Sequence, residues 1–400
     1  MNRNAALYPW YISLFGLMAW LPIFFLYFSE HLTLAQVLRL EAIYYAAVVL
    51  FEVPSGYFSD VVGRRPTLLI SAASMSLAYL LFLIGGGFWL FLLAQVLIAV
   101  GFAFKSGTDT SFHFDSLASL NQAEEYGPRE AVAGRNGMIA SALAVFIGGA
   151  LGLIDLRLAY ALSLVGMLGA LWVVLQFEEP AIDPGHKAPN PLAQLTACIG
   201  YARRPQLFWL FAFIILMTIL DHVPYEFYQP YLDLLGREGN ALFSGRTPLI
   251  AGIVMGISTL LGAWVAGSSI WIRKRIGLGA TMLLATAIQT VVITMMGSVL
   301  SAFVVPLIML RTVPMALSTA PMNAAIAPQV PQAQRATYFS MQSLAGRLAF
   351  SLTLLLLSIA AAGGSVEEWS TLAWMLRACA LLGVVGWIGL WASRSRVGVG

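Results

Sequence analysis

Cysteine and charged residues are the side chains that this sequence has least of. It holds two cysteines, Cys198 and Cys379, which lie so far apart that they indicate neither a disulfide framework nor a metal-ligand pattern. Charged residues make up only 10% of the chain, whereas 59% of it is hydrophobic. Because a water-exposed surface needs a much larger charged fraction, this composition excludes a soluble globular protein and predicts an integral membrane protein.

The motifs of common enzymes and of ATP-driven proteins are also missing. The chain has no GxSxG, no HExxH and no GxxxxGK[ST] phosphate loop. We therefore expect no enzymatic activity, no cofactor and no resident metal ion, and the energy source to be an ion gradient or the substrate's own gradient. The net charge of +3 is small and gives no support to nucleic-acid binding.

Long hydrophobic runs fill most of the chain. Stretches of roughly twenty apolar residues, the length of a membrane-spanning helix, recur twelve times. The first run lacks a small-residue cleavage site and is long enough to span, so we interpret it as a retained helix. We predict an all-α, multi-pass membrane protein with twelve transmembrane helices. The runs cover residues 8–28, 34–58, 67–84, 88–110, 131–153, 158–177, 207–230, 247–271, 278–299, 302–326, 337–362 and 369–392.

The polar connections give the orientation and the division into halves. Thirteen lysines and arginines fall in the connections of one side and three in those of the other, which predicts that both termini are cytoplasmic. The longest connection separates six runs from six, so we predict bundles at 1–178 and 207–400 around a cytoplasmic linker at 179–206. Residues 192–201 of this linker either lie flat on the inner leaflet or are plainly solvated. Short matches such as AGR at 133–135 and 345–347 favour a duplicated unit.

A short charged hinge separates the second and third runs and reads GYFSDVVGRRP over residues 56–66. Gly56 allows close helix approach, Asp60 caps backbone amides or pairs with a cation, and Gly63 permits a sharp turn. Arg64 and Arg65 then favour the cytoplasmic side. A polar turn this short predicts an antiparallel pair of helices.

The spacing of this hinge resembles the signature loop of the major facilitator superfamily, G-x-x-x-D-R/K-x-G-R/K-R/K, with Val61 in place of the usual base. EVPSG at 52–56 and SGTD with DSL at 106–117 resemble further pieces of its bacterial efflux-like branch. Gly148 and Gly149 lack the proline of the usual antiporter motif, which leaves the direction of transport open. The resemblance implies the major facilitator fold of two pseudo-symmetric six-helix bundles, and a conformational latch made of Gly56, Asp60, Gly63, Arg64, Arg65 and Asp115.

Ionisable side chains inside the predicted spans are few, and each is costly in a bilayer unless it has a partner, a cavity or a proton path. Lys105 and Asp109 share one helix face with His113, so the lysine neutralises the acid locally. On the seventh span, polar residues gather around Pro224. We predict that a coupling proton binds there and on the fourth span; the alternative is that the seventh helix ends early and its polar residues face the outer water. The predicted proton-coupling residues are Asp221, His222, Glu226 and Asp109.

Two arginines, Arg311 and Arg347, fall near the middle of the tenth and eleventh spans. Because arginine stays charged, each needs compensation there. They either pair with Asp221 or Glu226 or bind an anionic group of the substrate. For Glu52, which is too deep for solvent, the alternatives are a titrating gate and a static ion pair. The predicted substrate-binding residues are Glu52, Arg311, Arg347, Asn323 and Tyr225.

These observations together predict a proton-coupled secondary transporter that exports small amphipathic organic compounds by alternating access. We expect a lipid-embedded monomer in the bacterial inner membrane. The alternative is proton-driven uptake of an organic anion or a siderophore-like solute. A passive pore would not need titratable acids, an enzyme should bring a nucleophile or a metal set, and a sensor should carry a soluble domain.

Overall fold

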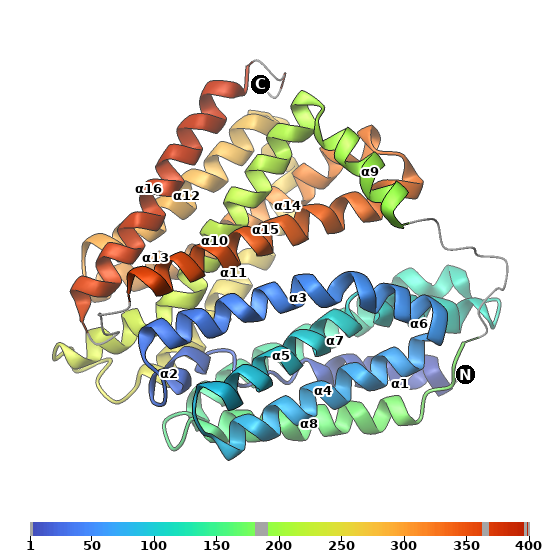
Figure 1. Ribbon diagram of the computed structural model, residues 1–400, viewed down its shortest axis with the longest axis horizontal. Coiled ribbons are helices and arrows are strands. Elements are labelled where there is room, and N and C mark those ends of the chain that lie inside the picture. Colours follow the sequence, from blue (N-terminus) through green and yellow to red (C-terminus); the bar gives the residue numbers. More distant parts are fainter. Residues whose placement is uncertain (1–2, 181–190, 362–367, 396–397, 399–400) are drawn as a thin grey trace. The chain divides into compact units, whose positions relative to one another are not determined.

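The computed structural model describes residues 3–180, 191–361, 368–395 and 398, and the described residues contain helices and no strand (Figure 1). The α-helices are α1 (Arg3–Phe15), α2 (Phe24–Ser29), α3 (Leu34–Val62), α4 (Arg64–Ile84), α5 (Phe88–Lys105), α6 (Thr108–Ala118), α7 (Tyr126–Leu151), α8 (Arg157–Leu175), α9 (Pro191–Ala202), α10 (Pro205–Arg237), α11 (Thr247–Ile276), α12 (Leu278–Ser298), α13 (Val305–Ile308), α14 (Val313–Ile326), α15 (Gln332–Ala360) and α16 (Trp369–Ser393). Short 3-10 helices are η1 (Ala123–Glu125), η2 (Ala302–Val304), η3 (Met309–Thr312) and η4 (Ala327–Gln329).

Eleven helical segments of the described chain are long and apolar enough to cross a membrane, and they correspond to the second to twelfth predicted spans. The first span differs from the expected single helix, because α1 ends at Phe15 and helix resumes only at Phe24. Pro22 lacks the N–H that a continuous helix would need there. The all-α membrane fold is therefore as predicted, with an interrupted first span.

The fourth span is also made of two helices. α5 ends at Lys105, and α6 begins at Thr108 after Gly107, whose φ of 74° lies in the left-handed region that favours glycine. This break places Asp109 in the first turn of α6 instead of the middle of one long helix.

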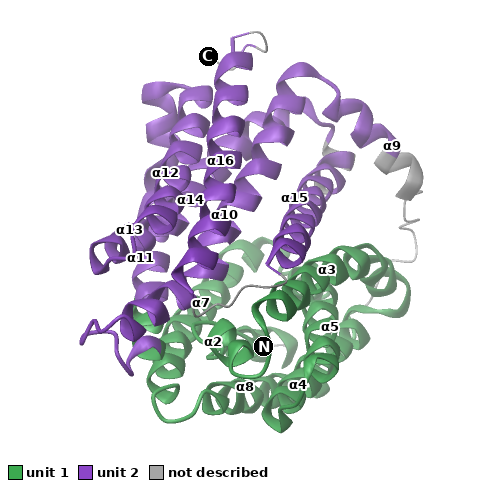
Figure 2. Cartoon of the chain, turned by 60° about the vertical axis from the view of Figure 1, so that its left-hand side comes forward, with its two compact units in different colours: residues 1–188, 248–253 green, residues 189–247, 254–400 purple. Residues whose placement is uncertain are grey.

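The chain forms two compact units, drawn in green and purple in Figure 2. Unit 1 contains residues 1–188 and 248–253, and unit 2 contains residues 189–247 and 254–400. Residues 181–190 of the predicted linker lie outside the described residues. The rest of that linker contains α9, which packs against α15 and is tied to it by a hydrogen bond from the Tyr201 hydroxyl to Gln334 Oε1 at 3.1 Å.

Unit 1 is organised by α4 and α5, which pack against each other and against α8 and α3, respectively. Its core is aromatic, and the Trp20 ring stacks on that of Tyr160 with their centres 6.1 Å apart. Phe82 contacts both Tyr160 and Phe91, and Phe91 in turn contacts Tyr27. In unit 2, α12 packs against α16 and α10 packs against α15.

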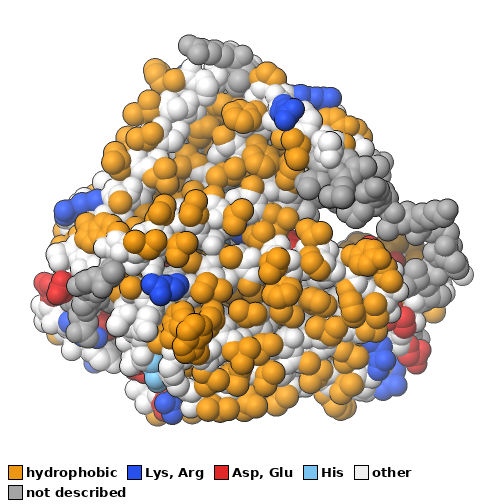
Figure 3. All heavy atoms as spheres, viewed as in Figure 1, with side chains coloured by type: hydrophobic (Ala, Val, Ile, Leu, Met, Phe, Trp, Pro, Cys, Tyr) orange, Lys and Arg blue, Asp and Glu red, His pale blue; other side chains and the backbone are white. Residues whose placement is uncertain are grey.

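The surface in Figure 3 is dominated by hydrophobic side chains, and charged side chains gather toward its margins. Large apolar side chains are widely exposed, including Phe303 at 91%, Ile154 at 79% and Trp89 at 78%. Such a surface is expected where lipid replaces water around the protein.

Candidate functional site

The predicted hinge is a one-residue turn between α3 and α4. Gly63 joins the two helices with φ 128°, a conformation that L side chains rarely adopt. A Cβ at this position would also lie 2.8 Å from the Glu179 carboxylate. The backbone conformation therefore favours glycine at residue 63, whereas the exposed Glu179 side chain could move to make room for a Cβ. At Gly56 the expected close helix approach is absent, since a Cβ there would meet no atom within 4 Å.

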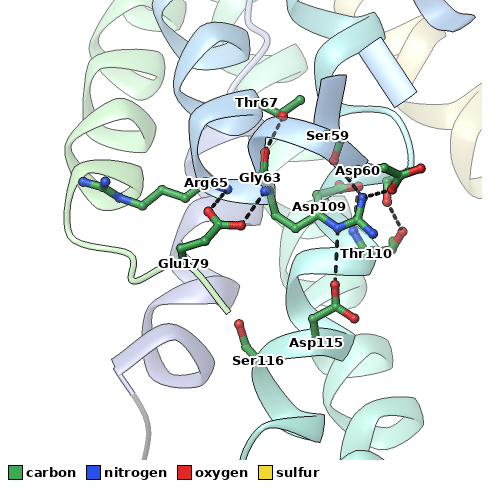
Figure 4. Close-up of polar contacts among 12 residues, drawn as sticks. Ser59, Asp60, Gly63, Arg65, Thr67, Asp109, Thr110, Asp115, Ser116 and Glu179 are labelled. Carbon is green, nitrogen blue, oxygen red and sulfur yellow. Dashed lines mark hydrogen bonds and ion pairs between the residues drawn. The ribbon is translucent and has the colours of Figure 1, made fainter. Parts of the chain in front are cut away.

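Arg64 connects three helices of unit 1. Its Nη1 donates to Asp60 Oδ1 at 2.5 Å and to Ser59 Oγ at 2.9 Å, and its Nε donates to Asp115 Oδ2 at 3.3 Å. Figure 4 shows Asp60 and Asp115 on α3 and α6 near the start of α4. The structure therefore brings together three of the predicted latch residues in one charge-assisted network.

Arg65 does not join this network, because its Nη2 donates to the Leu175 carbonyl at 3.1 Å. A residue that sequence reasoning missed stands beside it: Glu179 accepts the backbone N–H of Arg64 at 2.6 Å and of Arg65 at 2.8 Å (Figure 4). These are the first amides of α4, which have no partner inside the helix. The acid pair Glu178-Glu179 directly after the sixth hydrophobic run was the available signal.

The adjoining residue, Glu178, ties the end of α8 to the N-terminus. The Asn4 side chain donates to the Glu178 carbonyl at 2.8 Å and accepts the Glu178 N–H at 2.9 Å. The same Asn4 amide donates to Ser116 Oγ on α6 at 3.0 Å. α1, α6 and the segment after α8 are thereby held together next to the turn at Gly63.

Asp109 is buried and receives a hydrogen bond from Lys105 Nζ, so the predicted pair forms, although the break at Gly107 places the two residues on different helices and not on one helix face. His113 has a partner that the sequence did not reveal: its Nδ1 lies 2.6 Å from Glu130 Oε2 on α7. Tyr8 stacks on the His113 ring at 4.0 Å. These polar and ring contacts of His113, with Glu130 and Tyr8, are therefore made within unit 1.

In unit 2, α10 runs unbroken through Pro224 and Pro230 to Arg237. The alternative in which this helix ends early is therefore wrong, and Glu226 is fully buried within it. Asp221 is half-buried and lies one turn before Tyr225 on the same helix. The polar stretch is thus part of a continuous helix that is long and apolar enough to cross a membrane, and the binding of a coupling proton there stays a prediction.

Arg311, in η3, is only 6% exposed and lies against two aromatic rings. Its guanidinium lies 5.4 Å from the ring centre of Tyr225 and 5.3 Å from that of Tyr228, which is cation–π geometry. It also interacts electrostatically with Asp221, but among the described residues no ion pair within 4 Å joins the two. Of the alternatives for Arg311, the direct ion pair with Asp221 does not form, and the binding of a substrate anion stays a prediction.

His222 contributes a second polar group to this cluster. Its Nδ1 lies 2.8 Å from the Thr218 carbonyl, and its ring lies 4.9 Å from that of Phe350. Arg347 and Arg311 both interact electrostatically with it. Residues of α10, η3 and α15 thus form a cluster that contains both acidic and basic side chains. Asp221 and Arg311 belong to this cluster but do not form a salt bridge with each other.

Two predicted substrate residues lie elsewhere. Asn323 is twelve residues beyond Arg311, roughly 18 Å along the helical segment at 1.5 Å per residue. Glu52 is half-buried on α3, in unit 1. The predicted substrate set therefore does not form one cluster within a single unit.

A buried acid on α3 was missed altogether. Glu41 is 3% exposed and its Oε1 accepts a hydrogen bond from Gln95 Nε2 of α5 at 2.5 Å. A complete survey of the ionisable residues within the hydrophobic run at 34–58 would have found it.

At the other end of α3 from Gly63, polar loops of unit 1 line a cavity of about 450 Å³ that includes Glu30, His31, Asp155 and Arg157. Partial burial raises the pKa of Glu30, and Asp155 adds to this, whereas His31 and Arg157 oppose it. The cavity therefore holds two acids and two basic side chains close enough to influence one another.

Comparison with known proteins identifies relatives for this architecture. The family model described as Major Facilitator Superfamily matches residues 10–354. A variant of the nucleoside transporter NupG superposes with a TM-score of 0.80 at 14% identity, over 98% of this chain and 100% of that one. The peptide transporter POT gives 0.72 at 13% (99% and 94% covered). A bacterial homologue of the human lysosomal transporter Spinster gives 0.69 at 15% (99% and 96%). A search of curated proteins returned no match.

Proposed function

This chain belongs to the major facilitator superfamily and is a transporter, not an enzyme; on that premise we propose proton-coupled secondary transport that exports small amphipathic organic compounds by alternating access. It is a multi-pass membrane protein that moves small molecules. The proposal places it in the efflux-like branch of the family and in the bacterial inner membrane, as a monomer with both termini in the cytoplasm. Its bundles are residues 1–178 and 207–400, joined by the linker at 179–206.

One observation carries the proposal: an acid, a histidine and a second acid lie within a continuous spanning helix, next to a buried arginine. Asp221 is half-buried and has no ion pair with Arg311. Its carboxylate is therefore free of a direct salt bridge to that arginine and can take up a proton, while Arg311 still acts on it electrostatically. Proton binding by Asp221, His222 and Glu226 gives a membrane-embedded charge change of the kind that couples transport to a gradient. In unit 1, the Lys105–Asp109 pair is the corresponding candidate.

The second candidate function, uptake of an organic anion, is favoured by Arg311. Its Nε makes no hydrogen bond within the described chain, although the side chain is almost fully buried. A carboxylate or phosphate is the natural acceptor for such a donor. In this alternative Arg311 and Arg347 bind the anionic group and Tyr225 contacts the rest of the substrate, while Glu52 and Asn323 line other parts of the pathway.

Flux into proteoliposomes with an imposed pH gradient separates the two functions. A panel of amphipathic compounds and organic anions is offered on either side of the membrane. Accumulation of a cationic or neutral amphipathic compound against its gradient, driven by protons moving in the opposite direction, supports export. Anion accumulation on the side opposite to the acid refutes export and supports uptake.

The proton path is tested by the single variants Asp221→Asn, His222→Gln and Glu226→Gln. We expect at least one to abolish gradient-driven accumulation while keeping exchange of labelled for unlabelled substrate. Asp233→Asn is the matched control, since this acid lies on the same helix but forms an ion pair with Arg237 at 2.6 Å. Undiminished gradient-driven transport in all three test variants removes α10 from the proton path.

The turn at Gly63 is proposed as a conformational latch. Arg64 forms hydrogen bonds with both Asp60 and Asp115. This network joins α3, α4 and α6, and so it restrains the positions of all three helix ends. Breaking and remaking such charge-assisted bonds biases one conformation over another without touching the substrate. Gly63 supports the latch through the backbone of the turn, and Arg65 through its bond to the Leu175 carbonyl, whereas Gly56 is retained in the proposal only from its place in the signature loop.

A further inference from the structure

A carboxyl–amide pair is buried in unit 1, apart from the groups assigned above. Glu41 on α3 and Gln95 on α5 are each only 3% exposed, and Gln95 Nε2 donates to Glu41 Oε1 at 2.5 Å. Each residue is seven positions beyond the start of its helix, roughly 10 Å along it. Because the two side chains are in direct contact, no metal ion fits between them.

Among the described residues of unit 1, no cation balances the Glu41 carboxyl. The only ionisable side chain on α5 is Lys105, which lies roughly 15 Å further along that helix and is bound to Asp109. On α3, Arg39 is exposed and two residues away, so it points to another side of the helix. The other ionisable groups of the helices packed against α3 in unit 1 are Tyr27 of α2, Arg64, Arg65 and Tyr79 of α4, and, on α3 itself, Tyr44, Tyr45, Glu52, Tyr57 and Asp60.

The two tyrosines contributed by α2 and α4 are already engaged elsewhere. Tyr79 accepts a hydrogen bond from Trp20 at 2.9 Å, and Tyr27 donates to the Phe82 carbonyl at 2.5 Å. The arginines at the start of α4 adjoin the far end of α3, roughly 30 Å from Glu41 along the helix. The carboxyl therefore has the Gln95 amide as its hydrogen-bond partner, and no positive charge lies close by among the described residues of unit 1.

We propose that Glu41 binds and releases a proton, with Gln95 as its hydrogen-bond partner in both states, and so forms a second proton site of the transport cycle. An uncompensated carboxylate inside a membrane span is costly, and a proton is the ligand that removes its charge. The amide of Gln95 carries both a donor and an acceptor. Its NH₂ serves the ionised carboxylate, and after rotation its carbonyl accepts the O–H of the protonated carboxyl.

This arrangement differs from a salt bridge in one respect that matters for coupling. When an acid paired with arginine or lysine takes up a proton, it leaves a buried cation unbalanced. Protonation of Glu41 leaves no unbalanced charge and no unsatisfied hydrogen-bonding group, since the amide adapts. The pair is thus suited to exchange a proton in a closed, apolar environment. The inference rests on the proposed proton coupling for its place in the cycle, but not for the proton binding itself.

Infrared difference spectroscopy of the purified full-length protein tests the proposal without knowledge of the substrate. A protonated carboxyl has a C=O stretching band that is distinct from those of amides and carboxylates and shifts in D₂O. We expect such a band in the wild type that bleaches reversibly as the pH is raised from about 5 to 10, and its loss in Glu41→Gln.

Two further variants make the result interpretable. Glu125→Gln is the matched control, because Glu125 is half exposed and paired with Arg129 at 2.6 Å, and it should leave the band unchanged. Gln95→Leu should keep the band but move its frequency, because the hydrogen bond to the amide is lost. If Glu41→Gln keeps every pH-dependent carboxyl band of the wild type, Glu41 does not exchange a proton and the proposal is wrong.

The flux assay then distinguishes this failure from failure of the proposed function. Loss of gradient-driven accumulation in Glu41→Gln, with substrate exchange retained, supports a role in coupling. Unchanged gradient-driven accumulation in Glu41→Gln overturns that role while leaving the α10 cluster as the proton path. If wild-type flux does not respond to a pH gradient, proton-coupled transport fails, whereas the infrared titration still decides whether Glu41 binds a proton.

Discussion

Replacement of Glu179 by alanine should open the first turn of α4. The Glu179 carboxylate accepts the N–H groups of Arg64 and Arg65, at 2.6 and 2.8 Å. A side-chain cap of this kind contributes about 1 kcal/mol, and a negative charge at a helix N-terminus adds about 0.3–1 kcal/mol. Because Glu179 is exposed and therefore screened, we expect a total of about 1–2 kcal/mol.

Amide hydrogen exchange measures this free energy at the two bonds themselves. A loss of about 1–2 kcal/mol corresponds to exchange that is about 5–30-fold faster at Arg64 and Arg65 in Glu179→Ala, while the middle of α4 stays protected. High salt should reduce the difference, since part of the effect is the charge at the helix end.

Glu178→Ala is the control, because this neighbouring acid uses only its backbone in the described contacts, with Asn4. If Arg64 and Arg65 exchange no faster in Glu179→Ala than in Glu178→Ala, the carboxylate does not stabilise α4. Faster exchange along all of α4 would instead indicate that the whole helix has loosened. The effect of Glu179 would then not be a local cap on the first turn, as predicted.

Three further predictions concern packing, charge and conformation. In Gly148→Ala the new Cβ would lie 1.9 Å from a backbone oxygen, so we expect destabilisation by about 1–3 kcal/mol. This should appear as a lower unfolding temperature in detergent. Gly134→Ala is the control and should show no decrease, because its new Cβ would meet no atom within 4 Å. Because its raised pKa means that the fold favours neutral Glu30, this residue contributes stability below its ordinary pKa of 4.5 that is lost as the pH rises through the raised value. Glu30→Gln should therefore be slightly more stable than the wild type at neutral pH and equal to it in acid; the opposite order would contradict the sign. Asp60→Asn should shift the balance between inward- and outward-open states, measured by spin-label distances between the bundles, and reduced ligand affinity of the outward-open state itself would count against a latch.

Some of the local polar structure could be predicted from the sequence because the partners are only four residues apart. Lys105 and Asp109 are four residues apart, as are Asp60 and Arg64 across the turn at Gly63, and both pairs form. The members of each pair lie on different helices, separated by the break at Gly63 or Gly107, so their short separation along the chain and not the geometry of one helix brings them together. The same is not true of Glu130, which reaches His113 only because α7 packs beside α6.

The tenth span shows why the sequence did not reveal the partners of a buried arginine. The sequence placed Arg311 within a segment apolar enough to cross a membrane, but it did not show which groups surround it. Charge balance favoured an ion pair with an acid, whereas Tyr225 and Tyr228 of α10 present their rings to the guanidinium. An aromatic face competes well with a carboxylate when both must be desolvated, and sequence spacing does not reveal which one lies nearer.

The sequence by itself determined the class of this protein. Hydrophobic length specifies the number of spans because the bilayer thickness is fixed, and the hinge at Gly63 identifies the family because its turn tolerates few residues. Only the tertiary structure decided that the first span is interrupted, that Glu179 caps α4, and that Glu41 meets Gln95. Glu179 is 115 residues from Arg64 and Glu41 is 54 residues from Gln95, and only helix packing brings each pair within hydrogen-bond distance.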